Sequence, residues 1–167
     1  MAQTPPMSTP PTETDLHAAF CTQVLKTLIA DSMNHVSDLS GPEYSTVPNP
    51  NDSPELRASK EKAEAANQES KASLESQKAM LRRIDLYLKP RFFDLDPLPL
   101  AAAKRAAQED WKRMQSAMST CTSKCPMSLE ADALIKCNSD CAKRAMPDLP
   151  TIQQKMQSCL NLKWLPF

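Results

Sequence analysis

The six cysteines are the residues of this chain best suited to chemistry, and four of them form two matched pairs. Three residues separate Cys121 from Cys125, three separate Cys137 from Cys141, and eleven lie between the pairs. Positions i and i+4 share one face of a helix. If both segments are helices folded back as an antiparallel hairpin, Cys121 faces Cys141 and Cys125 faces Cys137. The spacing therefore predicts two disulfides that staple a helical hairpin.

The same four thiols could instead bind zinc, because four-thiolate sites accept spacings of about two to four residues. Such sites place their ligands on turns, whereas helix-forming residues surround these cysteines and the whole chain holds one glycine. We therefore favour disulfides over zinc or free thiols, and we expect no metal or other cofactor.

Cys21 and Cys159 remain outside this pattern. The sequence favours reading them as two small apolar residues on helix faces, and the alternative is a third bond between the N-terminal helix and the C-terminal arm. His17 lies one helical turn before Cys21, but two ligands do not make a metal site. The chain has no Ser-His-Asp set and no glycine-rich phosphate loop, so we do not expect an enzyme.

The composition indicates a helical protein. Ala, Lys, Glu, Gln, Met and Leu form helices readily, and a single glycine argues against hairpin-rich sheets. Twenty basic and twenty acidic residues cancel, so the charge expected of a nucleic-acid-binding protein is missing. The expected fold class is all-α: a disulfide-stapled antiparallel helical hairpin, with long N-terminal helices and proline-rich extended linkers.

Fifteen prolines divide the chain, because proline interrupts a helix interior. In particular, Pro90, Pro97 and Pro99 are expected to exclude helix from residues 90–100. The segments are an extended tail (1–11), an amphipathic helix (12–41), a linker (42–54), a long polar helix (55–89), a proline-rich strap (90–100), and the hairpin with an aromatic C-terminal tail (101–167).

Two features of these segments bear on packing. In the first hairpin helix, Trp111, Met114 and Met118 continue the seam of cysteines at heptad-like spacing. The polar helix can bury little apolar area, so we expect residues 1–100 to be ordered by neighbouring proteins and not by the hairpin. The aromatic residues expected to dock onto a partner are Phe92, Phe93, Trp164 and Phe167.

The paired Cys-x-x-x-Cys motifs over residues 105–160 resemble the small Tim chaperones of the mitochondrial intermembrane space. The resemblance implies that Cys121 and Cys141 form an outer bond and that Cys125 and Cys137 form an inner one. It also implies import by the oxidative machinery of that compartment. The N-terminus has no pattern of a secretory signal, and no segment is apolar enough to span a membrane.

These observations favour one function over another. We expect a non-catalytic accessory subunit of a large mitochondrial inner-membrane complex, of the respiratory chain or ATP synthase, on the intermembrane-space side. Its partners would be other subunits of that complex. The alternative is a small Tim-type chaperone for hydrophobic precursors. The long segment 1–100, which the resemblance does not cover, favours the subunit.

Overall fold

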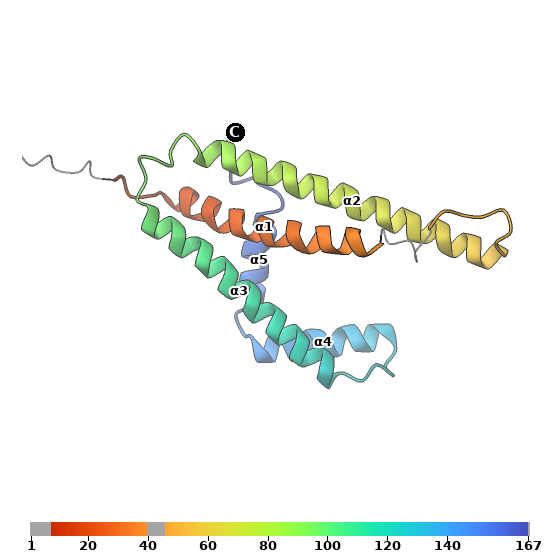
Figure 1. Ribbon diagram of the computed structural model, residues 1–167. Coiled ribbons are helices and arrows are strands. Elements are labelled where there is room, and N and C mark those ends of the chain that lie inside the picture. The colour runs from red at the N-terminus through yellow and green to blue at the C-terminus, as the bar shows by residue number, and fades with distance from the viewer. Residues whose placement is uncertain (1–7, 40–45, 167) are drawn as a thin grey trace, which may run out of the picture. The chain divides into compact units, whose positions relative to one another are not determined.

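The computed structural model describes residues 8–39 and 46–166 (Figure 1). The expected all-α fold is confirmed, because the described residues form five helices. The helices are α1 (Glu13–Leu39), α2 (Pro54–Leu88), α3 (Pro97–Lys124), α4 (Ala131–Ala145) and α5 (Leu149–Ser158).

These helices fall into two compact units. The first takes in the chain up to Val24 and from Ile84 onward, and the second takes in Leu25–Arg83. Both boundaries lie inside helices, so α1 and α2 each contribute to both units. No described helix is both long and apolar enough to cross a lipid bilayer.

The first two helices begin at side-chain caps. The Thr12 hydroxyl accepts a hydrogen bond from the Asp15 amide at 3.2 Å, and the Asp15 carboxylate accepts one from the Thr12 amide at 2.8 Å. This reciprocal pair is a capping box with aspartate in the position usually held by glutamate. At the start of α2, the Ser53 hydroxyl accepts from the Leu56 amide at 3.2 Å, ahead of Pro54 in the first helical position.

α3 begins earlier than the prolines suggest. Its N-cap is Asp96, whose carboxylate accepts a hydrogen bond from the Leu98 amide at 3.0 Å, and the helix starts at Pro97. The expectation that residues 90–100 exclude helix is therefore wrong at its C-terminal end. The amide groups in the first turn of a helix have no intrahelical acceptor. Pro97 and Pro99, which lack an amide hydrogen, therefore cost the helix no hydrogen bond there.

The first half of α1 is the centre of the first unit. The five consecutive residues from Ala18 to Thr22 are all buried, and together they cover every face of the helix. A helix that is buried all round is enclosed by other elements. Ala19 packs with Leu95 and Leu100 in one buried cluster. This part of α1 is thus packed within its own chain, and the expectation that residues 1–100 take their order from neighbouring proteins is wrong for it.

The described part of the N-terminal tail forms backbone hydrogen bonds with another segment of the chain. The Thr9 amide donates to the Asp94 carbonyl at 2.7 Å, and the Asp96 amide donates to the Thr9 carbonyl at 2.9 Å. This isolated parallel bridge ties the tail to the segment between α2 and α3.

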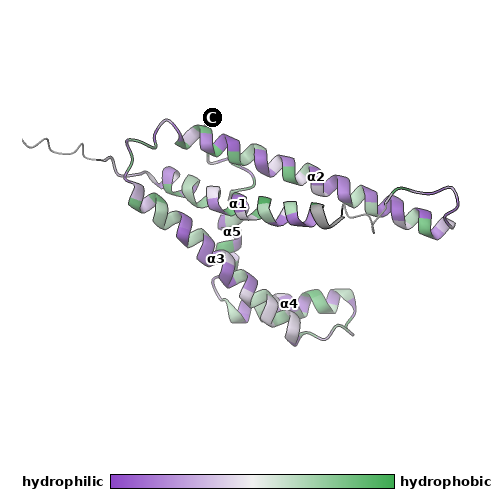
Figure 2. Ribbon diagram, viewed as in Figure 1, coloured by the Kyte–Doolittle hydropathy of each residue, from purple (hydrophilic) through white to green (hydrophobic). Residues whose placement is uncertain are grey.

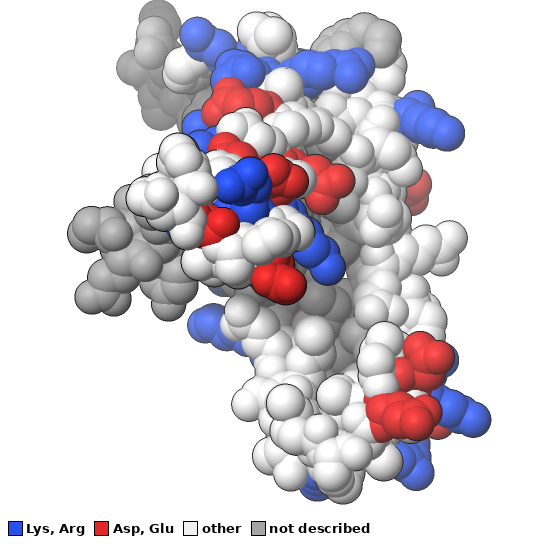
Figure 3. All heavy atoms as spheres, turned by 90° about the vertical axis from the view of Figure 1, so that its right-hand side faces the viewer, with Lys and Arg blue, Asp and Glu red and all other residues white. Residues whose placement is uncertain are grey.

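The second unit is mostly polar. α2 is hydrophilic along most of its length, and Figure 2 shows this as a largely purple helix. Leu74 and Asn67 are among its few buried side chains. On the face drawn in Figure 3, exposed side chains carry both charges and neither sign covers the face, in keeping with the net charge of zero.

One carboxylate is completely buried in the first unit. Asp15 is 0% exposed, and the Tyr87 hydroxyl donates to it at 2.9 Å, while Arg91 forms an ion pair with it at 3.1 Å. Burial alone would raise the pKa of Asp15, but the hydrogen bonds from Thr12 and Tyr87 and the charge of Arg91 together hold that pKa below its ordinary value. The ionised carboxylate therefore stays buried because its oxygens are paired.

We expect Tyr87→Phe to lower the free energy of unfolding by about 1.5–3 kcal/mol, because it removes a hydrogen bond to a buried charge. Chemical denaturation with the disulfides intact would measure this change. Ser123→Ala is the matched control, since it removes an exposed hydroxyl that bonds only to the nearby Thr120 carbonyl. Equal losses for the two variants would contradict the role given to the buried carboxylate.

Candidate functional site

Two disulfides join the end of α3, including its C-cap residue Cys125, to α4. Cys121 is bonded to Cys141 with their Cα atoms 5.6 Å apart, and Cys125 is bonded to Cys137 with their Cα atoms 6.0 Å apart. The cysteine nearer the end of α3 is bonded to the cysteine nearer the start of α4. The two helices therefore run in opposite directions where they meet.

The face that α3 buries differs by one residue from the expected seam. Ala107, Ala117 and Cys121 are buried, whereas Met118 is 60% exposed. The prediction that Met118 lies on the seam is wrong. Adjacent residues are about 100° apart around a helix, so Ala117 and Met118 lie on opposite sides of the line through Met114 and Cys121. A small rotation of the helix about its axis therefore buries Ala117 and exposes Met118.

A third disulfide joins Cys21 of α1 to Cys159 at the end of α5. The two residues are 138 positions apart in sequence, and both are 0% exposed. The favoured interpretation of these two residues as unbonded apolar side chains is wrong, and the alternative third bond is present. The even number of cysteines was the signal for it, because six thiols can all be paired.

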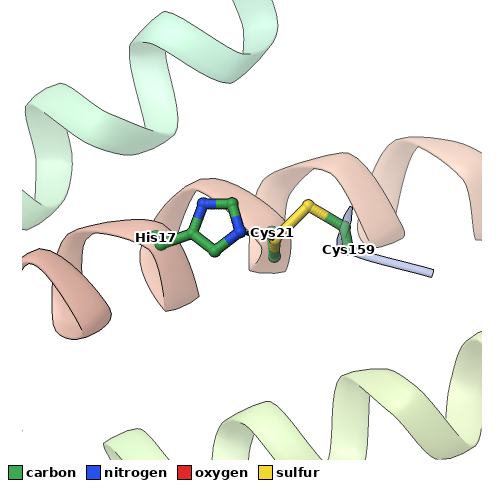
Figure 4. Close-up of side chains that lie close together, drawn as sticks. All are labelled: His17, Cys21 and Cys159. Carbon is green, nitrogen blue, oxygen red and sulfur yellow. Dashed lines mark hydrogen bonds between the residues drawn. A yellow bond between two sulfur atoms is a disulfide. The ribbon is translucent and has the colours of Figure 1, made fainter. Parts of the chain in front are cut away.

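The third bond lies against a histidine. His17 and Cys21 project from successive turns of α1, and the imidazole ring points toward the bonded sulfurs (Figure 4). His17 Nε2 lies 3.7 Å from Cys21 Sγ and 2.8 Å from Ser158 Oγ. The Ser158 hydroxyl donates to the Lys155 carbonyl at 2.6 Å. Since that hydroxyl has one proton to give, its oxygen is the acceptor for Nε2–H of the histidine.

The electrostatics of this histidine favour its neutral form. Burial lowers the pKa of His17, and the positive charge of Lys155 lowers it further. Lys155 itself lies over the ring of Phe20, with Nζ 3.9 Å from the ring centroid. The neutral ring is thus held between one disulfide and one hydroxyl.

Trp164 closes the other side of His17. Its ring meets the imidazole edge-on, with centroids 4.5 Å apart, and its Nε1 donates to the Ser158 carbonyl at 2.9 Å. The chain returns to this position through Leu162, which has a left-handed φ of 48°. Trp164 was expected to dock onto a partner, but its half-buried ring packs on its own chain.

The other residues expected to dock onto a partner differ in their surroundings. Phe92 is 54% exposed and Phe93 is 91% exposed, and their rings contact each other edge-on, with centroids 6.1 Å apart. Phe167 lies outside the described residues. Phe92 and Phe93 are therefore the aromatic pair that remains available to another molecule.

The chain matches no protein family, no curated protein and no solved structure with which it was compared. Its function is therefore inferred from its own residues and from the spacing of its cysteines.

We expect removal of the third disulfide to cost more stability than removal of the inner one. Because a longer closed loop restrains the unfolded chain more, Cys21→Ala/Cys159→Ala should lower the free energy of unfolding by about 5 kcal/mol and Cys125→Ala/Cys137→Ala by about 3 kcal/mol. Guanidinium unfolding under non-reducing conditions would measure both. Alanine in both positions leaves no unpaired thiol in either variant. If the two losses are equal, or if removal of the Cys125–Cys137 bond costs more, restraint of a long loop does not explain how the Cys21–Cys159 bond stabilises the protein.

Proposed function

We propose that this chain is a non-catalytic accessory subunit of a large mitochondrial inner-membrane complex, of the respiratory chain or ATP synthase, on the intermembrane-space side. The observation that carries this proposal is the pair of Cys-x-x-x-Cys motifs, together with the pairing of all six cysteines in disulfides. Disulfides persist in oxidising compartments and are rare in the cytosol. Oxidation of the helical pairs by the import machinery would retain such a chain in the intermembrane space.

The exposed aromatic pair supports a docking role. Phe92 and Phe93 lie in the short segment between α2 and α3, and the leucines on either side of it in sequence, Leu86 of α2 and Leu98 of α3, are exposed as well. Aromatic side chains are enriched where protein interfaces bury their central residues. We infer that this segment, residues 86–98, inserts its aromatic side chains into a pocket of a neighbouring subunit.

The long polar helix supports the same role. Most side chains of α2 between Glu55 and Ala72 are exposed, and a helix of this kind is stable when it bridges other elements or carries many local ion pairs. Lys60 of this stretch forms an ion pair at 2.9 Å with Asp52, which precedes the helix. A helix of 35 residues is about 50 Å long, which is long enough to extend across a neighbouring subunit.

A second candidate function has an observation in its favour. Four apolar side chains are exposed around the connection between α3 and α4, and two of them belong to flexible methionines, which suit surfaces that adapt to many partners. They are Met118, Met127, Leu129 and Ile135. A chaperone of the small Tim type would bind hydrophobic precursors with such a surface.

One experiment separates the two functions. We expect Phe92→Ser/Phe93→Ser to lower co-migration of the chain with a large complex on native gels of detergent-solubilised mitochondria. Met127→Ser/Ile135→Ser, the matched control, should leave co-migration unchanged. Both pairs are exposed, so both variants should keep the unfolding midpoint of the natural chain.

The opposite result would favour the chaperone function over the subunit function. In that case no large complex would be found, and Met127→Ser/Ile135→Ser would weaken protection of an unfolded membrane precursor against aggregation. Phe92→Ser/Phe93→Ser would protect the precursor as well as the natural chain does.

A further inference from the structure

Three potential metal ligands meet at the third disulfide. The ligand atoms of His17, Cys21 and Cys159 all lie within 4.8 Å of one another. Sequence reasoning found only the first two, because the third comes from 138 residues further along the chain. We propose that, when the Cys21–Cys159 bond is reduced, these three side chains bind a zinc ion.

The distances suit a tetrahedral ion. Zn–N bonds of about 2.0–2.1 Å and Zn–S bonds of about 2.3 Å place a nitrogen and a sulfur ligand about 3.6 Å apart. His17 Nε2 and Cys21 Sγ are already 3.7 Å apart. Their spacing of four residues on one helix keeps them adjacent whether or not the disulfide is present. Cys159 lies just past the last residue of α5, where a small adjustment can separate its sulfur from that of Cys21.

The charge balance also suits the ion. Both cysteines are 0% exposed, and buried unpaired charges are costly. Two thiolates and one neutral imidazole around Zn²⁺ have no net charge, so the loaded site can remain buried. A hollow lined by Leu16, His17, Ala103 and Lys155, among others, opens beside the histidine and gives the ion a path to it.

Reduction and metal binding are two separate steps. A dithiol reductant gives two electrons and two protons to the Cys21–Cys159 bond, which breaks to two thiols while the reductant closes to a cyclic disulfide. Zn²⁺ then displaces the two thiol protons, and the Nε2 lone pair of His17 becomes its third protein ligand. Nε2 carries the ring proton in this structure, so the ring must change tautomer: Nε2 gives its proton to water and Nδ1 takes one up, which frees the Nε2 lone pair and keeps the imidazole neutral. The fourth position is left for water or the Ser158 hydroxyl. The same three side chains thus hold either a covalent bond or an ion, and never both.

The two histidines of the chain provide an internal control. We expect stepwise addition of Zn²⁺, up to four equivalents, to the reduced, ¹⁵N-histidine-labelled chain to shift the ring resonances of His17 and leave those of the exposed His35 unchanged. In the oxidised chain, Zn²⁺ should shift neither histidine. In reduced Cys21→Ser/Cys159→Ser, the His17 shift should disappear, although the four cysteines of α3 and α4 remain free to bind zinc.

Three results would overturn the proposal: no shift of His17 in the reduced chain, equal shifts of both histidines, or a His17 shift that persists in Cys21→Ser/Cys159→Ser. A second measurement leaves all six cysteines in place. Titration against a chromophoric chelator should show that reduced His17→Gln binds one zinc ion more weakly than reduced His35→Gln does. The difference should exceed the cost of losing an outer-shell partner, about 10- to 100-fold. Equal affinity and stoichiometry in the two variants would also overturn the proposal.

Discussion

The covalent bond between Cys21 and Cys159 constrains the rest of the first unit. It fixes the first half of α1 to the end of α5 across 138 positions of sequence. The two bonds between α3 and α4 close much shorter loops, with separations of 20 and 12 residues. They hold one pair of helices together, whereas the third bond brings the start of the chain into the same compact unit as its end.

Enclosure of α1 explains the polar chemistry around it. Asp15 lies in the first turn, before the enclosed residues 18–22, and is itself 0% exposed. Its carboxylate therefore has no access to water and must be paired within the protein, as it is with Tyr87 and Arg91. His17 is half-buried, and its ring contacts a disulfide, a serine hydroxyl and the edge of Trp164. Exposed apolar side chains lie elsewhere, and they include those between α2 and α3 and those around the α3–α4 connection. Docking would therefore use segments outside the enclosed part of α1.

Local patterns in the sequence predicted the helical class and the presence of disulfides, because composition, capping residues and cysteine spacing act over a few residues. Contacts between distant segments were harder to predict. The partner of Cys21 depends on where α5 ends, and Trp164 looked free because the left-handed turn at Leu162 has no glycine to signal it. The start of α3 was missed for a different reason: proline was read as a helix breaker at Pro97, although the first turn accepts it.

Peptide mapping without reduction tests most directly whether Cys21 and Cys159 are bonded. Cleavage after lysine and arginine separates Cys121 from Cys125, and a further cleavage before Asp140 separates Cys137 from Cys141, so each bond gives a distinct linked pair of peptides. The structure predicts that the peptide containing Cys21 is linked to the one containing Cys159, at full occupancy. Free, alkylated Cys21 and Cys159, or a link from Cys21 to any other cysteine, would contradict it.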